Sequence, residues 1–108
     1  MRMWKVEPEV MCRKNLLGEH VEMHMMVGCL NKNISVDGYI NDGLFEMDAI
    51  VERHNQLVEE MTKRGYNHQS PLPDFTYKGY NGKVDVDNNL KELCNRCEEC
   101  KKKILNAN

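Results

Sequence analysis

Two histidines and a glutamate stand close together in the first third of the chain, in the order His20-Val-Glu-Met-His24. Histidines four residues apart share one face of a helix, where both imidazoles can bind the same metal ion. A helix turns by about 100° per residue, so Glu22 points away from that face. In zinc proteases, by contrast, the glutamate directly follows the first histidine. We therefore interpret the two histidines as a partly buried pair and not as metal ligands.

Three cysteines near the end of the chain, Cys94, Cys97 and Cys100, form a C-x2-C-x2-C run. Thiolates at this spacing are typical ligands of zinc or iron–sulfur clusters, but a closed site needs a fourth ligand, and none is obvious. Cys97 and Cys100 also fall on an apolar helical stripe, which favours free thiols acting as small hydrophobic residues. The odd total of five cysteines, without a secretory signal, indicates reduced thiols.

The chain start offers a third reactive group, the α-amine of Met1. An α-amine has an ordinary pKa of about 8 and a lysine amine one of about 10.4, so at pH 7 far more of the α-amine is neutral and nucleophilic. Removal of an initiator methionine requires a small second residue. Because Arg2 is large, we expect Met1 to be retained. Most chain termini do no chemistry, so this group alone predicts no activity.

Hydrophobic spacing predicts three amphipathic helices that must position these groups. The first is expected from about Arg13 to Leu30. The second is expected from about Glu46 to Arg64, with Gly65 placed to end it. The third is expected from about Asp87 to Leu105, behind an aspartate cap. We therefore predict an all-α fold, with one compact domain of three main helices and long connecting loops over residues 1–108.

Two connecting segments carry turn signals in place of helical spacing. Between the first two helices, Asn31 to Phe45 contains Asp37-Gly38 and Asp42-Gly43, which suit a short hairpin. The segment from Tyr66 to Val86 contains two prolines and an Asn-Gly pair, and we expect it to form a structured surface loop.

Composition and charge narrow the classes of function. The 108 residues are too few for two ordinary domains, and no apolar run approaches the roughly 18 residues of a membrane helix. The formal charge is −2, with mildly basic ends and an acidic middle, so contact with nucleic acid requires a local basic patch. Charged residues stand where a secretory signal would be apolar, and we therefore expect a cytoplasmic protein.

Two longer runs carry the most specific pattern in the sequence. The first is Asn15-Leu-Leu-Gly-Glu-His-Val-Glu-Met-His-Met-Met-Val-Gly28, and the second is Arg53-His-Asn-Gln-Leu-Val-Glu-Glu-Met-Thr-Lys-Arg-Gly-Tyr-Asn67. In their spacing from each other and from the chain start, they resemble the two long helices of the pyrimidine-dimer DNA glycosylases, the phage endonuclease V family. The likeness covers about residues 1–70.

The resemblance implies a chemistry for the chain start. In that family an N-terminal α-amine attacks C1′ of a damaged nucleotide, expels the base and forms a Schiff base, and a glutamate on the first helix is indispensable. By resemblance these roles fall on Met1 and Glu22. A carboxylate suits both steps, because it stabilises the cationic imine and can remove the C2′ proton. The reaction needs no cofactor and no metal ion.

The resemblance also implies contacts with damaged double-stranded DNA. Arg2 and Lys32 match basic positions of the family. Basic side chains near the first helix are our candidates for phosphate contact: Arg2, Arg13, Lys14 and Lys32. A weaker candidate is the cluster from Lys101 to Lys103.

The chain departs from the family pattern at two places. The family has arginines beside its glutamate and one turn later, where this chain carries Val21 and Met25, so part of the phosphate grip is absent. The aromatic C-terminal segment of the family is not recognisable either. Candidates to replace it by stacking on DNA, or else to anchor a loop, are Phe75, Tyr77 and Tyr80.

We therefore predict a DNA glycosylase with abasic-site lyase activity that acts, as a monomer, on pyrimidine dimers or a related base lesion. Two alternatives remain open. One is a non-catalytic helical module that binds nucleic acid or protein. The other is a cysteine-based metal-binding protein.

Overall fold

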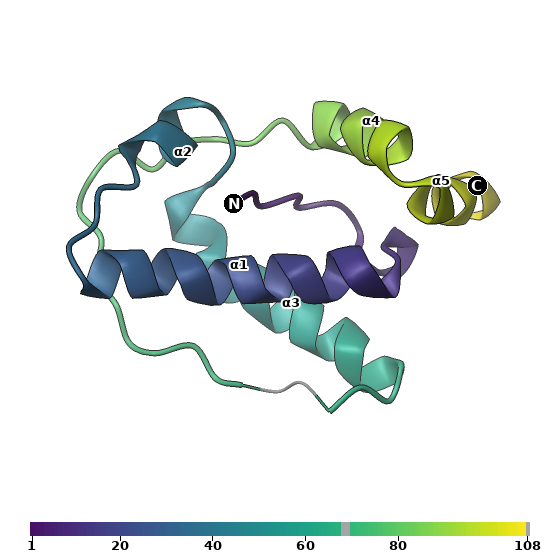
Figure 1. Ribbon diagram of the computed structural model, residues 1–108, viewed down its shortest axis with the longest axis horizontal. Helices are drawn as coiled ribbons and strands as arrows, with labels where there is room; N and C mark the ends of the chain where they lie inside the picture. The colour runs from purple at the N-terminus through teal and green to yellow at the C-terminus, as the bar shows by residue number, and fades with distance from the viewer. Residues whose placement is uncertain (68–69, 108) are drawn as a thin grey trace.

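The computed structural model describes residues 1–67 and 70–107, which form helices joined by irregular segments (Figure 1). The five α-helices are α1 (Arg13–Asn31), α2 (Asp37–Asn41), α3 (Ile50–Lys63), α4 (Val86–Arg96) and α5 (Glu98–Asn106). Two 3-10 turns, η1 (Pro8–Val10) and η2 (Met47–Ala49), precede α1 and α3. The described residues contain no β-strand, so the predicted all-α fold class is confirmed.

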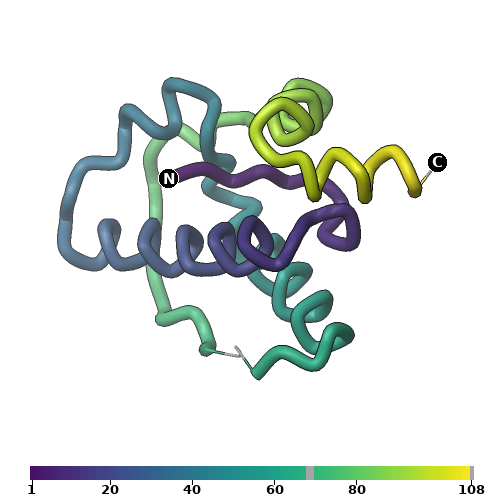
Figure 2. Tube along the Cα trace, turned by 45° about the vertical axis from the view of Figure 1, so that its right-hand side comes forward, coloured from purple at the N-terminus to yellow at the C-terminus, as the bar shows by residue number. Residues whose placement is uncertain are grey.

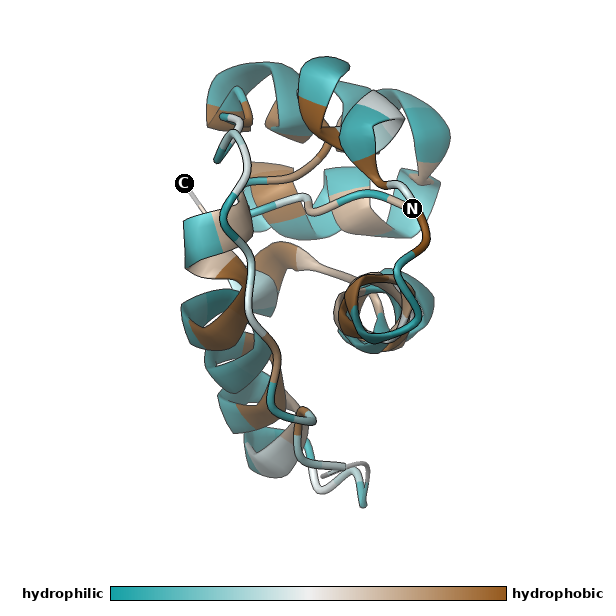
Figure 3. Ribbon diagram, turned by 90° about the vertical axis from the view of Figure 1, so that its left-hand side faces the viewer, coloured by the Kyte–Doolittle hydropathy of each residue, from teal (hydrophilic) through white to brown (hydrophobic). Residues whose placement is uncertain are grey.

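The helices surround an extended N-terminal segment, residues 1–7. α1 crosses α3, and the view along α1 in Figure 3 shows α3 beside it and the chain start above it. Figure 2 shows the same segment running between α1 and the pair formed by α4 and α5. The molecule is flattened, with extents of 41 × 30 × 17 Å. The N-terminal segment is thus held by helices that come from both ends of the sequence.

α1 has the bounds that the sequence predicts, give or take one residue. Its N-cap residue is Cys12, whose thiol accepts a hydrogen bond from the Asn15 amide at 3.4 Å. It ends where the Lys32 amide bonds back to the carbonyls of Gly28 and Cys29. Both ends of the helix are capped, its 19 residues make a little more than five turns, and six of its side chains are buried.

α3 confirms the second predicted helix, although its first turn is the 3-10 turn η2. Its buried stripe recurs at helical spacing and ends near Gly65, which adopts a φ of +78°. Only glycine takes this left-handed conformation without strain, so the predicted stop signal is confirmed.

The predicted hairpin after α1 is wrong, because the segment contains the short helix α2 instead. Val36 and Ile40 are buried four residues apart, a spacing that places them on one helical face. Gly43 has a φ of +74° just beyond α2. The Asp-Gly pairs are turn signals, but they bound a single helical turn and not a strand pair.

The predicted third helix is also wrong as a continuous element, because it is divided into α4 and α5 at Cys97. Cys97 has extended dihedral angles, φ −135° and ψ 109°; its amide still bonds to Leu93 while its thiol caps α5. The break turns α5 toward η1, which it contacts, and buries Cys100. An unbroken apolar stripe does not reveal such a bend, since the stripe is continuous in both arrangements.

The long connection between α3 and α4 has no helix or strand in its described residues, as the sequence predicts. Its second half is fastened to η2, because the Asn81 carbonyl accepts the Met47 amide at 2.9 Å and its side chain accepts the Asp48 amide. Gly82 has a φ of +77°, and a Cβ there would lie 2.5 Å from the Phe45 carbonyl oxygen. Only glycine fits at this approach.

Methionine supplies much of the core volume. Six of the eight methionines are buried, together with Leu, Ile, Val, Phe45 and Trp4. Flexible thioethers can fill the irregular space between crossing helices.

Among the described residues, no helix is long and apolar enough to cross a membrane.

Candidate active site

The N-terminal segment is fixed by main-chain hydrogen bonds to two distant parts of the chain. The Met3 amide donates to the Leu44 carbonyl at 2.8 Å. The Asn89 side chain, on α4, donates to the Trp4 carbonyl at 2.8 Å and to the Met3 carbonyl at 3.3 Å. Met3 and Trp4 are themselves buried. The chain start therefore has a defined position in place of the disorder that is common for termini.

A buried ion pair holds the same segment from the other side. The Arg53 guanidinium, on α3, donates to both carboxylate oxygens of Glu19, on α1, at 2.6 and 2.8 Å. It also donates to the Val6 carbonyl at 2.7 Å. Both side chains are at most 2% exposed. One guanidinium therefore connects α1, α3 and the N-terminal segment, with the two-bond geometry that arginine forms with carboxylates.

Lys5 makes a sharp bend in the segment. Its φ is +58°, which a residue other than glycine rarely adopts. The bend is held by its ammonium, 2.8 Å from Glu46, and by its amide, 3.5 Å from Glu19. It lets the residues before it run along α1 toward Glu22.

These contacts bring the α-amine of Met1 to 3.8 Å from Oε1 of Glu22. The Arg2 amide donates to the same oxygen at 3.1 Å. Glu22 lies midway along α1, and its side chain is 28% exposed, so the pair is accessible at one side. Burial is the largest influence on Glu22 and, with the negative charge of Glu19, raises its pKa against the opposing effects of the α-amine and the Arg2 amide.

A pocket of about 400 Å³ opens at this pair. The chain start, α1, α4 and the segment between α2 and η2 supply its lining residues: Met1, Arg2, Trp4, Asn15, Glu22, Leu44 and Arg96. The guanidinium groups of Arg2 and Arg96 lie over the Trp4 ring, at 4.2 and 5.7 Å from its centre. The pocket thus combines an amine, a carboxylate and two permanent cations, which is a chemistry suited to an anionic substrate that reacts with a nucleophile.

Comparison with known protein families adds an independent finding: residues 1–74 match the family described as pyrimidine dimer DNA glycosylase. The chain belongs to this family. No curated protein and no solved structure matches it. The match includes α1, α3 and the N-terminal segment, and therefore both members of the Met1–Glu22 pair. α4 and α5 lie beyond it.

The basic residues expected to contact DNA are spread over the glycosylase-family chain. Arg2 lines the pocket, where its guanidinium donates to the Asn89 side chain at 2.6 Å. Arg13 and Lys14 are exposed at the start of α1, and Lys32 is exposed at its end. At about 1.5 Å per residue, these two groups stand nearly 30 Å apart along the helix, with Glu22 between them.

The three aromatic candidates lie on the connection between α3 and α4. Phe75 and Tyr77 pack partly against the core, and the Tyr77 hydroxyl donates to the Tyr80 carbonyl at 2.8 Å. Tyr80 is 69% exposed. None of the three lines the pocket at the chain start, as far as the described residues define it. Phe75 and Tyr77 therefore act as loop anchors, while Tyr80 is free to meet another surface.

The two histidines of α1 have a third partner on α3. His20 and His54 are buried, His24 is half-buried, and the three rings lie 4.8 to 5.1 Å apart. The Nε2 atoms of His24 and His54 are each within 3.2 Å of the Ser70 carbonyl. The arrangement could ligate a metal ion, although these two Nε2 atoms also have hydrogen-bond partners within the protein, namely the Ser70 carbonyl and each other at 3.2 Å.

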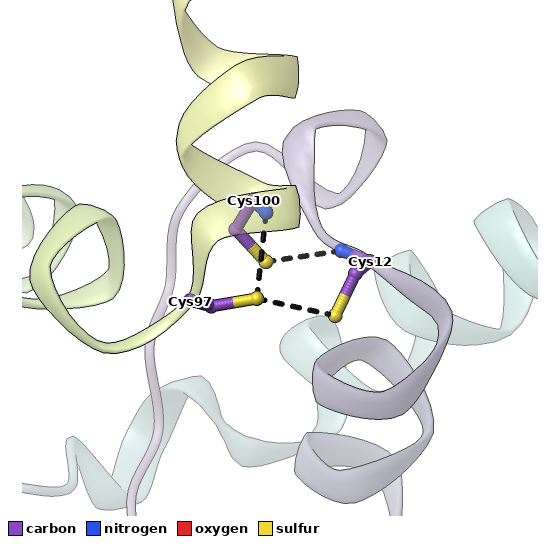
Figure 4. Close-up of side chains that lie close together, drawn as sticks. All are labelled: Cys12, Cys97 and Cys100. Carbon is purple, nitrogen blue, oxygen red and sulfur yellow. Dashed lines mark hydrogen bonds between the residues drawn. The ribbon is translucent and has the colours of Figure 1, made fainter.

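The cysteine run is rearranged by the bend between α4 and α5. Cys97 and Cys100 meet Cys12 at the start of α1, whereas Cys94 is not part of the cluster (Figure 4). No sequence pattern joins Cys12 to this run, because 85 residues separate it from Cys97. All five cysteines are free.

Sequence reasoning also missed the residues that position the chain start. Arg53 and Glu19 are charged residues within helices, a type that usually faces solvent. Asn89 and Arg96 lie in a predicted helix without any pattern that links them to Met1. Neither the burial of a charged pair nor a contact between distant segments produces a pattern in the neighbouring sequence from which it could be predicted.

Proposed function

We propose that this chain is a DNA glycosylase with abasic-site lyase activity, acting on pyrimidine dimers or a related base lesion through the α-amine of Met1. The observation that carries the proposal is the 3.8 Å separation between that amine and Glu22, inside the part of the chain that matches the family. The proposed substrate is damaged double-stranded DNA, bound by a monomer inside the cell.

The proposed reaction begins with attack of the neutral Met1 amine on C1′ of the damaged nucleotide. The glycosidic bond breaks, and the base leaves with the bonding electrons. Loss of an amine proton and opening of the sugar ring then give a cationic imine between Met1 and C1′. Because Glu22 is close to this nitrogen, its carboxylate stabilises the positive charge.

Strand cleavage follows by elimination. The Glu22 carboxylate takes the proton from C2′, the electron pair forms the C2′–C3′ double bond, and the C3′–O bond breaks with the phosphate as leaving group. Burial raises the pKa of Glu22, which makes its carboxylate a stronger base for this step. Water then hydrolyses the imine and regenerates the Met1 amine.

The cationic side of the pocket suits the DNA backbone. Arg2 and Arg96 line the same pocket as the amine, and both guanidinium groups lie over the Trp4 ring, at 4.2 and 5.7 Å from its centre. We propose that they hold the phosphates on either side of the displaced nucleotide, while exposed Arg13, Lys14 and Lys32 meet phosphates further along the duplex. Displacing a nucleotide is easiest where damage has already weakened stacking.

Borohydride trapping tests the proposal. The full chain is incubated with duplexes that carry a single pyrimidine dimer, an abasic site or no lesion, and borohydride reduces any imine to a stable adduct. We expect adducts on the first two duplexes, with the DNA mapped by peptide mass to the Met1 amine. Binding to damaged DNA without an adduct, or an adduct on a lysine, would contradict the assignment of Met1.

Two variants separate the amine from the carboxylate. One additional glycine before Met1 moves the amine by up to about 3.8 Å, and we expect it to abolish trapping while the protein stays folded. Glu22→Gln keeps the shape of the side chain and should lower strand cleavage by about 100-fold or more. The matched control is Glu52→Gln, an exposed carboxylate on α3, which should leave cleavage unchanged. Full activity of Glu22→Gln would refute the role of Glu22.

A further inference from the structure

Three thiols from opposite ends of the chain lie together at the junction of α1 and α5 (Figure 4). The sulfur atoms of Cys12, Cys97 and Cys100 all lie within 4.8 Å of one another, and those of Cys12 and Cys97 are 3.7 Å apart. A disulfide requires about 2.05 Å, so these sulfurs are not bonded. Zn–S bonds of about 2.3 Å hold two thiolates of a tetrahedral site about 3.8 Å apart, close to the separation observed.

Each sulfur also accepts a hydrogen bond from the main chain. The amide donors are Asn15 to Cys12 at 3.4 Å, Cys100 to Cys97 at 3.4 Å, and Cys12 to Cys100 at 3.1 Å. The Asn15 side-chain amide adds bonds to the sulfurs of Cys12 and Cys100, at 3.2 and 3.5 Å. Donors directed at sulfur stabilise thiolates, which are the form that binds metal ions.

Two of the thiols occupy the N-caps of helices. Cys12 caps α1 and Cys97 caps α5, so both sulfurs face the positive end of a helix dipole. A thiol that serves only as a small hydrophobic core residue needs neither this placement nor a set of N–H donors. Cys97 is moreover only half-buried, which leaves a side of the cluster open to solvent.

We propose that Cys12, Cys97 and Cys100 form a zinc site, in which three thiolates bind one Zn²⁺ and a water molecule takes the fourth position. This donor set selects a soft or borderline cation over Mg²⁺ or Ca²⁺. The thiol protons pass to solvent as the metal binds.

The site would join α5 to the start of α1 across 85 residues of sequence. It connects the C-terminal helices, which lie beyond the family match, to the part of the chain that carries the candidate active site. Asn15 links the two directly, since it donates to the sulfurs and also lines the Met1–Glu22 pocket. The zinc site does not depend on the proposed glycosylase reaction.

Cobalt substitution tests the site in the full chain. Co²⁺ bound to thiolates gives an intense charge-transfer absorption in the near ultraviolet, whereas Co²⁺ bound only to histidine does not. We expect this band to saturate at one equivalent of Co²⁺ and to disappear when Zn²⁺ is added. Absence of the band in the reduced wild-type protein would overturn the proposal.

Variants assign the ligands. Cys97→Ser should lose most of the band with an unchanged circular dichroism spectrum, because this half-buried residue can be replaced without opening the core. Cys94→Ser is the matched control, since its sulfur lies outside the cluster, and it should retain the band. His24→Asn should also retain it. A band that survives Cys97→Ser, or that is lost in His24→Asn, would place the metal elsewhere.

A measurement on the unchanged chain completes the test. Zn²⁺ should slow alkylation of Cys97 at least tenfold and leave alkylation of Cys94 unaffected, as followed by peptide mass. Equal protection of both cysteines, or protection of neither, would contradict the site. This result does not depend on how any variant folds, because the wild-type chain is used.

Discussion

The buried pair of Glu19 and Arg53 offers the sharpest test of how the chain start is positioned. Replacing Arg53 with methionine retains an unbranched apolar stem but removes both bonds to the Glu19 carboxylate and the bond to the Val6 carbonyl. Glu19 has no exposed surface, and among the residues that the structure describes it then keeps a hydrogen bond from the Lys5 amide at 3.5 Å. Breaking one side of a buried ion pair costs about 3–5 kcal/mol, because the remaining charge stays buried.

Urea unfolding followed by circular dichroism measures the loss. With a denaturant dependence of about 1.5 kcal/mol per molar urea, Arg53→Met should lower the midpoint by about 2–3 M. The double variant Glu19→Met with Arg53→Met should recover most of that loss, because no buried charge remains.

A surface pair provides the control. Glu92 and Arg96 also form an ion pair, at 2.8 Å, but their side chains are 38% and 59% exposed. Exposed pairs contribute about 1 kcal/mol or less, so Arg96→Met should shift the midpoint only slightly. Equal shifts for Arg53→Met and Arg96→Met, or a double variant no more stable than Arg53→Met, would refute the reasoning from burial.

Three further predictions concern the site and its supports. Since burial raises the pKa of Glu22, the folded chain holds that proton more tightly than the unfolded chain, and the carboxylate lowers stability once the pH exceeds its raised pKa. Glu22→Gln should therefore unfold at a higher urea concentration than wild type at pH 7, with the difference vanishing as the pH falls through the pKa of Glu22; a less stable variant at pH 7 would contradict this. Gly82→Ala should lose about 1–3 kcal/mol in the same assay, because its positive φ and the nearby Phe45 carbonyl exclude a Cβ, and an unchanged midpoint would be the opposing result. Asn89→Ala should lose about 1–3 kcal/mol by leaving the Trp4 carbonyl without its donor, and should weaken borohydride trapping in parallel; unchanged trapping would show that α4 does not position the amine.

The two long helices could be predicted because their signals are local. Buried side chains recur at helical spacing along α1 and α3, and Gly65 marks the end of α3. Elements with weaker local signals were predicted less well. Asp-Gly pairs suit several kinds of turn, so they did not distinguish a hairpin from the single turn of α2. The bend at Cys97 lies within a continuous apolar stripe, and only packing against η1 reveals it.

The candidate site divides in the same way. Met1 and Glu22 were predicted from a resemblance to a family. The family itself is now shown by the match to residues 1–74, and the roles of the two residues are our proposal. The residues that hold Met1 in place were not predicted. Arginine is a residue type that is usually exposed. Arg53 is buried because it forms an ion pair with Glu19 on another helix, and that pairing cannot be read from the sequence around Arg53.

The sequence by itself determined the helical character of the chain, the ends of its two long helices and the family to which it belongs, because these properties depend on neighbouring residues or on recurring motifs. Tertiary structure alone decided that the α-amine lies beside Glu22, that Arg53 is buried against Glu19, and that Cys12 meets Cys97 and Cys100. Each of these contacts joins residues at least 20 positions apart, and their approach depends on how whole helices pack against one another. No single stretch of sequence records that packing.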